Sequence, residues 1–308
     1  MEIYLPIAEL SINVFLLLGL GAAAGLLSGM FGVGGGFLAT PLLIFAGIPP
    51  AVAVASQVNQ VVANSVSSLQ VQWRRGNVDF RMGLVLLLGG MIGSSGGVWL
   101  FTWLKRIGQI DFVIATLYVV LLSTIGVMML AESLRTWAVR RRNPEAPRGK
   151  LHTHYLVHRL PLKLRFYKSK LYISALLPVG LGFAIGILSA ILGVGGGFIL
   201  VPAMIYLLGM PTAVVIGTSN FQILFVAANV TFLHAATNGT VDIVLALLLI
   251  VGGVVGAPIG ARIAARLPGV LLRGLMAAII LAVATELLVQ LLRTPVSPFS
   301  LGVREVLP

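Results

Sequence analysis

Two glycine-rich segments hold the residues of this chain that are best suited to binding chemistry. The hexapeptide GVGGGF occurs at residues 32–37 and recurs unchanged at 193–198. Adjacent glycines weaken a helix and allow backbone conformations that are closed to other residues. Such a break leaves amide N–H groups unpaired at the N-terminus of the next helix, where the helix dipole is positive. We therefore predict an anion site at the two glycine triplets, Gly34, Gly35 and Gly36, and Gly195, Gly196 and Gly197.

The segments that follow the two breaks are rich in amide and hydroxyl side chains. Such groups are costly in hydrocarbon unless they find partners, so they should face the interior of a helix bundle. There they either line a cavity or act as hydrogen-bonding contacts between helices. Neutral donors of this kind can hold an oxyanion without a buried cation. The residues predicted to bind substrate are Ser56, Gln57, Asn59, Gln60 and Asn64 in the first segment and Thr218, Ser219, Asn220 and Gln222 in the second.

Other glycines fit a purely structural role. Small residues four apart share one helix face and let two helix backbones approach closely. The triplets could in principle serve the same purpose, but packing needs one small residue per turn and not three in a row. Close packing is predicted for Gly89, Gly93 and Gly97, and for Gly252, Gly256 and Gly260.

Residue types needed for catalysis do not form a recognisable group in the sequence. The chain has no cysteine, which excludes disulfides, thiolate catalysis and cysteine-ligated metal. Paired carboxylates and a nucleophile beside a base are not evident either. GVGGGF differs from the G-x-G-x-x-G pattern of nucleotide-binding loops. We therefore predict neither an enzyme nor a cofactor.

A few ionisable residues lie near the expected helix ends. His234 is expected to be a satisfied interfacial residue and not a titrating switch. The spacing of His152, His154 and His158 would bind a metal only weakly, so no metal site is predicted. Solvation at the membrane interface is expected for the acids Asp111, Glu132, Asp242 and Glu286.

The composition indicates an integral membrane protein. The chain has 308 residues, of which 58% are hydrophobic and 10% charged, and its mean hydropathy is +1.03. Asp, Glu, Lys and Arg are absent between Glu9 and Arg74, and again between Lys170 and Asp242. Such stretches belong in lipid, and the chain has room for about eight to ten crossings of roughly 20 residues each.

An internal repeat organises the chain. Its two copies of GVGGGF lie 161 positions apart, which chance does not explain. The duplicated unit spans about 120 residues in each half, as judged from the matched positions. These are residues 25–41 with 186–202, Pro50 with Pro211, Asn59 with Asn220, and GNVDF at 76–80 with GTVDI at 239–243.

Each half is predicted to hold a long helix, the glycine break, a short half-helix and three further helices. A helix of about 11 residues rises only some 16 Å, roughly half the hydrocarbon core. The predicted helices are 10–31, 37–47, 51–72, 83–104 and 111–133 in the first half, and 172–192, 198–208, 212–233, 243–265 and 270–292 in the second.

The formal net charge of +12 is concentrated in the segment 135–170. Under the positive-inside rule this segment is cytoplasmic, and anionic lipid, not nucleic acid, is its expected neighbour. Loops at equivalent positions in the two halves then lie on opposite sides of the membrane. The two halves are therefore expected to be inverted repeats. The expected fold is all-α and polytopic, with eight long and two short segments. Both termini would lie outside; four full crossings per half, with termini inside, is the alternative. The expected division is 1–134 and 171–293 for the repeats, 135–170 for the basic loop and 294–308 for a tail.

The repeated motifs resemble the sulfite exporter TauE/SafE family, also called the 4-toluene sulfonate uptake permease family. The resemblance is carried by GLLSGMFGVGGGF and GILSAILGVGGGF, by the segment from Pro50 to Asn59, by TAVVIGTSN at 212–220 and by GGVVGAPIGARIAARLP at 252–268. It covers both halves. In the first half Ala55, Ser56 and Gln57 replace the family's Gly-Thr-Ser, which stands at Gly217, Thr218 and Ser219.

The resemblance implies a secondary permease for small sulfur-containing anions such as sulfite, sulfoacetate or other organosulfonates. We expect alternating access in the inner membrane, with the bilayer and a small anion as partners. An anion channel, or a permease for another small carboxylate or oxyanion, is the alternative. The coupling ion, H⁺ or Na⁺, and a homo-oligomeric state are left open by the sequence.

Overall fold

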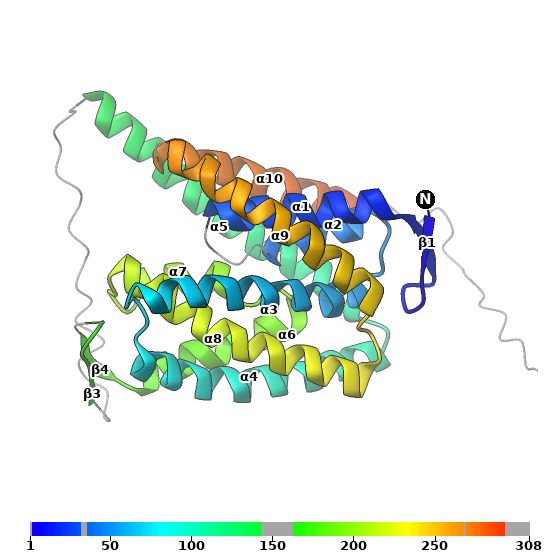
Figure 1. Ribbon diagram of the computed structural model, residues 1–308, viewed down its shortest axis with the longest axis horizontal. Helices are drawn as coiled ribbons and strands as arrows, with labels where there is room; N and C mark the ends of the chain where they lie inside the picture. Colours follow the sequence, from blue (N-terminus) through cyan, green and yellow to red (C-terminus); the bar gives the residue numbers. More distant parts are fainter. Residues whose placement is uncertain (1, 32–35, 143–162, 170, 268, 293–308) are drawn as a thin grey trace, which may run out of the picture.

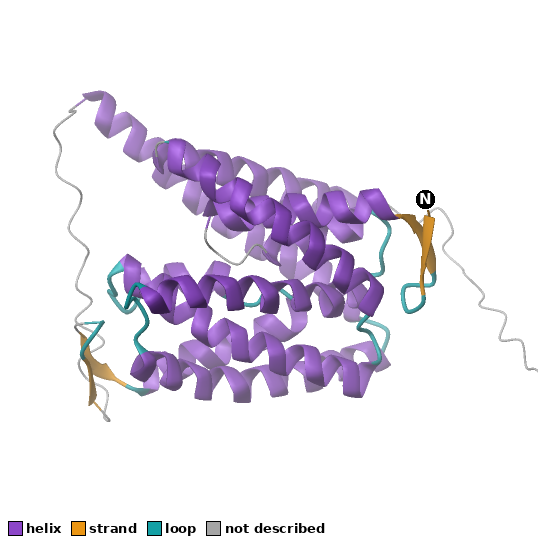
Figure 2. Cartoon of the chain, in the orientation of Figure 1, coloured by secondary structure: helices purple, strands orange, loops and turns teal. Residues whose placement is uncertain are grey.

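The computed structural model describes residues 2–31, 36–142, 163–169, 171–267 and 269–292, and most of them are helical (Figures 1 and 2). His152, His154 and His158 lie outside this part. The helices of the first half are α1 (Val14–Phe31), α2 (Gly36–Phe45), α3 (Pro50–Arg74), α4 (Phe80–Arg106) and α5 (Ile110–Arg142). Those of the second half are α6 (Leu176–Leu192), α7 (Gly197–Tyr206), α8 (Thr212–Leu233) with the π-helical turn η2 (His234–Asn238), α9 (Ile243–Arg266) and α10 (Gly269–Leu292).

The helices identify a polytopic membrane protein. Within the described residues, five helices are long and apolar enough to cross a bilayer: Phe80–Arg106, Ile110–Arg135, Val214–Asn238, Ile243–Ala264 and Gly274–Leu292. The apolar parts of α1 and α6 are shorter, and the polar side chains of α3 keep it out of this group. The predicted count of eight long segments and two short ones therefore stays a prediction.

Two β-hairpins were not predicted from the sequence. β1 (Glu2–Leu5) pairs with β2 (Leu10–Asn13), and β3 (Lys163–Phe166) pairs with β4 (Leu171–Ser174), both antiparallel. Each hairpin leads into the first helix of its half, and the two hairpins lie at opposite ends of the helix bundle (Figure 1). We refer to these ends as the β1–β2 end and the β3–β4 end.

The first two helices of each half form a helical hairpin that returns to the end where it began. Ile48, just after α2, packs in one buried cluster with Leu5 of β1. Met210, just after α7, packs in another with Phe166 of β3. With only 10 residues each, α2 and α7 are about 15 Å long, half of a hydrocarbon core. Short helices therefore follow both glycine-rich segments, at the places where half-helices were expected.

Each half packs its first helix against the fourth helix of the other half. α1 runs along α9 and α6 runs along α4, while α3 pairs with α8 and α5 with α10. The predicted packing glycines line both seams. A methyl group at Gly93 would overlap the carbonyl oxygen of Phe183 in α6, and one at Gly256 would overlap that of Ala22 in α1. Such contact between backbones leaves no room for a Cβ.

The structure corrects the register of the repeat after the half-helices. α3 follows the N-cap residue Pro49, whereas α8 follows Pro211, so Pro49 and not Pro50 is the equivalent of Pro211. The preceding turns contain Gly47 and Gly209, both with positive φ, at the same distance from these prolines. One additional residue after α7 accounts for the shift, and matching Asn59 with Asn220 was wrong by one position.

Candidate functional site

Gly36, the last glycine of the first triplet, meets the glycine break of the second half at a junction inside the molecule. The side chain of Val61 in α3 contacts both, because a Cβ built on Gly36 would lie 2.7 Å from its Cγ2 and one on Gly195 would overlap its Cγ1. The carbonyl oxygen of Val194 lies 3.0 Å from the same Cβ position on Gly36. Gly195 and Gly196 have φ values of 68° and 78°, in the left-handed region that glycine adopts without strain. Such a junction is what a single anion site at both glycine triplets requires.

Two aromatic rings stack beside this junction, at the starts of α2 and α7. Phe37 and Phe198, the second residues of α2 and α7, stack with ring centroids 4.2 Å apart and planes 8° from parallel. The carbonyl oxygen of Leu192, freed where α6 ends, accepts hydrogen bonds from the hydroxyls of Tyr118 in α5 and Thr40 in α2. The carbonyl group left without a helical partner where α6 ends is therefore satisfied.

Gln57 is the predicted polar residue that lies at this junction. Its side chain is 1% exposed, and its Nε2 lies 2.9 Å from the position of a Cβ on Gly36. Its Oε1 is buried and has no hydrogen-bond partner among the described residues. A buried unpaired amide atom costs about 1–3 kcal/mol, so this atom is suited to a donor that arrives with a ligand.

Gln60 and Gln222 occupy equivalent places in α3 and α8 but differ in their bonding. Gln60 donates from Nε2 to the carbonyl oxygen of Gly21 in α1 at 3.2 Å. Gln222 is 0% exposed, and both its amide atoms lack a partner among the described residues. Its amide lies against Gly90 of α4, as that of Gln60 lies against Gly253 of α9. The amide of Gln60 therefore joins α3 to α1, whereas that of Gln222 has no partner in the described part of the chain.

Ser56 and Thr218 lie away from this junction, at the beginnings of α9 and α4. The backbone N–H of Asp242 donates to Ser56 Oγ at 2.9 Å, and that of Asp79 donates to Thr218 Oγ1 at 3.0 Å. Both hydroxyl side chains are 0% exposed. Each fixes the N-cap residue of a helix in the other half, which is a structural contact.

Asp79 and Asp242 are buried helix caps, and the expectation of interfacial solvation for Asp242 was wrong. The carboxylate of Asp242 accepts from the N–H groups of Val244 and Leu245 and, through Oδ2, from Ile7 in the β1–β2 turn. Asp79 accepts from Met82 and, through Oδ2, from the N–H and hydroxyl of Ser169. The repeated GNVDF and GTVDI motifs contained this signal, because an Asp directly before a helix favours an N-cap.

The remaining predicted residues make local contacts or cannot be described. Asn59 donates to the carbonyl oxygen of Ser56, and Ser219 to that of Ile216. Asn220 donates to Ser68 Oγ in α3 at 2.8 Å and so joins α8 to α3. Asn64 is half-buried and Gly197 begins α7. Gly34 and Gly35 lie outside the described residues.

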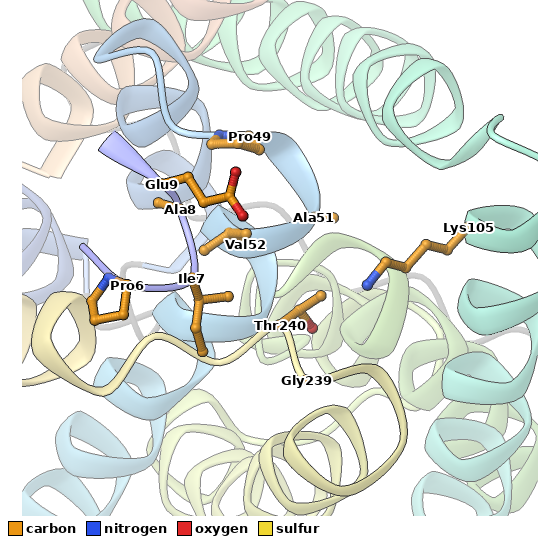
Figure 3. A pocket seen from close by; sticks show the side chains of 10 residues that line it. All are labelled: Pro6, Ile7, Ala8, Glu9, Pro49, Ala51, Val52, Lys105, Gly239 and Thr240. Carbon is orange, nitrogen blue, oxygen red and sulfur yellow. The ribbon is translucent and has the colours of Figure 1, made fainter. Parts of the chain in front are cut away.

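A pocket of about 490 Å³ opens at the β1–β2 end (Figure 3). It lies between the β1–β2 turn, the start of α3, the end of α4 and the segment before α9. Lys105 reaches toward Thr240 across it, and the Glu9 carboxylate lies on the opposite side. None of the predicted site residues lines this pocket. Its walls are Pro6, Ile7, Ala8, Glu9, Pro49, Ala51, Val52, Lys105, Gly239 and Thr240.

His234 is buried, and both ring nitrogens have hydrogen-bond partners, as expected of a satisfied residue. Its side chain is 0% exposed, and its ring packs edge-on against Phe101 of α4 at 4.5 Å between centroids. Nε2 lies 3.0 Å from the carbonyl oxygen of Ala190, two residues before the end of α6. The ring therefore packs between α4 and α6.

Comparison with known proteins identifies the family. The sulfite exporter TauE/SafE family model matches residues 17–287, which include both glycine breaks and all ten helices, in whole or in part. This chain belongs to that family. It is 29% identical over 246 residues to a probable membrane transporter protein of Xylella fastidiosa strain 9a5c, a match covering 79% of this chain and 81% of that protein.

Two relatives from Bacillus subtilis strain 168 agree. The probable membrane transporter protein YjnA is 29% identical over 251 residues, covering 80% of this chain and 87% of its own length. YunE, also named a probable membrane transporter protein, is 26% identical over 243 residues, covering 76% and 82%. No solved structure matches the chain. This TauE/SafE protein is therefore a multi-pass membrane transporter.

Proposed function

We propose that this TauE/SafE protein is a secondary permease for small sulfur-containing oxyanions, such as sulfite or an organosulfonate. The observation that carries the proposal is the junction of Gly36 with the glycine break of the second half, where the Gln57 amide places its Nε2 donor beside Gly36. Gln222 in the other half adds a buried amide whose Nε2 donor has no partner among the described residues. Neutral amides and helix N-termini suit an oxyanion because they hold its oxygens without a fixed cation.

The arrangement of the halves supports transport by alternating access between inverted repeats. The β1–β2 and β3–β4 hairpins are equivalent in sequence position and lie at opposite ends of the bundle (Figure 1). The helical hairpins α1–α2 and α6–α7 reach the centre from those opposite ends. In such a pair, rocking one half against the other exposes a central site to each side in turn.

A flux assay tests the site. We expect Gln57→Leu and Gln222→Leu each to lower sulfite or sulfoacetate counterflow in proteoliposomes at least about tenfold, because leucine removes amide groups that would contact the anion. Gln70→Leu is the matched control: Gln70 lies in α3 but is exposed, and counterflow should stay within about twofold of wild type.

Wild-type flux without counterflow would indicate a channel instead of a carrier. Equal counterflow in wild type, Gln57→Leu and Gln222→Leu would refute the site assignment while leaving the transport activity standing. Absence of flux for every sulfur oxyanion would refute the substrate class.

The basic residues support an inner-membrane orientation with the β3–β4 end in the cytoplasm. Arg74 and Arg75 close α3, Arg81 opens α4 and packs over the ring of Tyr167, and Lys168 donates to the carbonyl oxygen of Gly76. These contacts gather cations at the end from which the segment 135–170 departs. Under the positive-inside rule that end faces the cytoplasm.

Cysteine labelling tests this orientation, since the natural chain has no cysteine. We expect a membrane-impermeant maleimide to label Ile107→Cys, in the exposed turn between α4 and α5, in intact cells. Arg75→Cys, in the exposed turn between α3 and α4, should react only after permeabilisation. The reverse pattern would invert the proposed orientation.

A further inference from the structure

The helix α8 ends in a π-helical turn that has no counterpart in α3. Both helices follow an N-cap proline and lead to a glycine of positive φ, Pro49 to Gly76 in the first half and Pro211 to Gly239 in the second. The second interval is one residue longer. A single inserted residue in a helix is accommodated as a π-helical turn, and such turns occur often at functional sites. His234 is its first residue.

The hydrogen bonds around His234 define the protonation of its ring. The carbonyl oxygen of Ala190, 3.0 Å from Nε2, can only accept, so Nε2 carries a proton. Nδ1 lies 3.2 Å from Asn238 Nδ2 and accepts from it in the neutral ring. Asn238 Oδ1 lies 3.0 Å from the hydroxyl of Thr102 in α4.

The same network satisfies a doubly protonated ring after one local change. The amide orientation of an Asn is assigned from its hydrogen bonds, and turning that of Asn238 by half a rotation places Oδ1 against Nδ1–H. Asn238 Nδ2 then donates to Thr102 Oγ1, whose own proton goes to the carbonyl oxygen of Val98 at 2.8 Å. His234 can therefore take up a proton with every donor matched to an acceptor and with the backbone unchanged.

The first half shows the same contact without a titratable group. Gln72 lies 23 residues after Pro49, as His234 lies after Pro211, and its Oε1 accepts from Asn77 Nδ2 at 3.1 Å. A glutamine thus serves where only a structural hydrogen bond is needed. The second half places a histidine there, in a buried position between α4, α6 and α8.

Lys105 joins this histidine to the pocket. Its Nζ donates to the backbone carbonyl oxygen of Asn238 at 3.0 Å, and its side chain lines the pocket opposite Glu9 (Figure 3). Among the described residues, Lys105 is the charged group that interacts electrostatically with His234. The group of α6 that faces the ring is the uncharged carbonyl of Ala190. An anion beside Lys105 offsets that charge, which makes a second positive charge on the ring less unfavourable.

We propose that His234 is the proton-binding site of this transporter and that an anion in the pocket beside Lys105 promotes its protonation. The inference rests on the proposed function, because it names the proton as the coupling ion of that permease. By linkage, a proton on His234 then raises the affinity for the anion by the same factor.

Nitrogen NMR of a single-histidine protein tests the site directly. His152, His154 and His158 are replaced by Asn, and the full chain is labelled with ¹⁵N-histidine in nanodiscs. We expect the neutral Nε2–H tautomer in alkali and an imidazolium in acid. The titration midpoint should rise by about one pH unit with saturating sulfoacetate, or with Lys105→Gln in its absence. Ring signals unchanged from pH 4 to 9 would refute the proton site. A titration midpoint that is unchanged by both sulfoacetate and Lys105→Gln would refute the coupling between the anion and the proton.

A second measurement uses flux. An inward proton gradient at pH 6–8 should stimulate sulfoacetate uptake by wild type several-fold, and His234→Gln should bring the ratio of uptake with and without the gradient to about one. Gln72→Leu, the matched change in the first half, should keep the wild-type ratio. Stimulation that survives in His234→Gln would overturn the proposal. Absence of wild-type uptake would refute the proposed substrate, while the NMR titration would still decide the proton site.

Discussion

Replacing Gly93 by valine is expected to prevent folding of this protein, whereas the same change at Gly96, three residues along α4, is expected to be tolerated. A Cβ at Gly93 would overlap the carbonyl oxygen of Phe183 in α6, while one at Gly96 would have nothing within 4 Å. Because the obstacle is backbone, a side-chain rotation cannot relieve it, and the cost should be about 3 kcal/mol or more. Gly256→Val, at the seam of α9 with α1, should fail in the same way.

Fluorescence-detected size exclusion and thermal melting in detergent measure this prediction. Gly93→Val and Gly256→Val should give little monodisperse protein, and Gly96→Val should elute and melt like wild type. Since all three changes add the same side chain to an apolar helix, propensity effects cancel in the comparison. Equal behaviour of the three variants would show that the two seams are not closely packed.

Removal of the buried carboxylate at Asp79 or Asp242 should be the most damaging change among the polar residues. Each caps a helix and also holds the turn of a β-hairpin, Ser169 in one case and Ile7 in the other. Alanine at either position removes the cap and leaves buried N–H groups without acceptors, a loss of about 3 kcal/mol or more. Asp79→Asn keeps one acceptor oxygen and should lose less.

The free energy of unfolding in detergent, measured by denaturant titration, tests this expectation. Asp111→Ala is the control: Asp111 also lies in the first turn of a helix but is exposed, so its loss should be below about 1 kcal/mol. Each variant should also release one hairpin from the helix bundle. We expect faster proteolytic cleavage after β2 in Asp242→Ala and after β3 in Asp79→Ala. Equal losses at all three aspartates would contradict a special role for the two buried caps.

The sequence predicted the helices well, because their limits are marked by strong local signals. The glycine breaks, the prolines before α3 and α8 and the changes in hydropathy place the predicted ranges close to the helices found. One anion site was predicted at both glycine triplets, and Gly36 and Gly195 both contact the side chain of Val61. The packing glycines were recognised from four-residue spacing alone.

Features that depend on tertiary contact were not predictable in the same way. Asp242 and Asp111 look alike in sequence, as single acids near helix starts, yet one is buried and the other exposed. Whether a hydroxyl such as that of Ser56 faces a cavity or a helix cap depends on what the other half brings beside it. The pocket is lined largely by turns and helix ends, whose relative placement has no local signal.

The exchanged pairing of α1 with α9 and α4 with α6 has a consequence for biogenesis. During synthesis α1 emerges more than 200 residues before α9, the helix that fills its glycine seam. Fewer residues separate α4 from its partner α6, but the basic segment lies between them in the sequence. The seam of α1 therefore remains open to lipid until α9 has been synthesised, and truncation before α9 leaves α1 without its main packing surface.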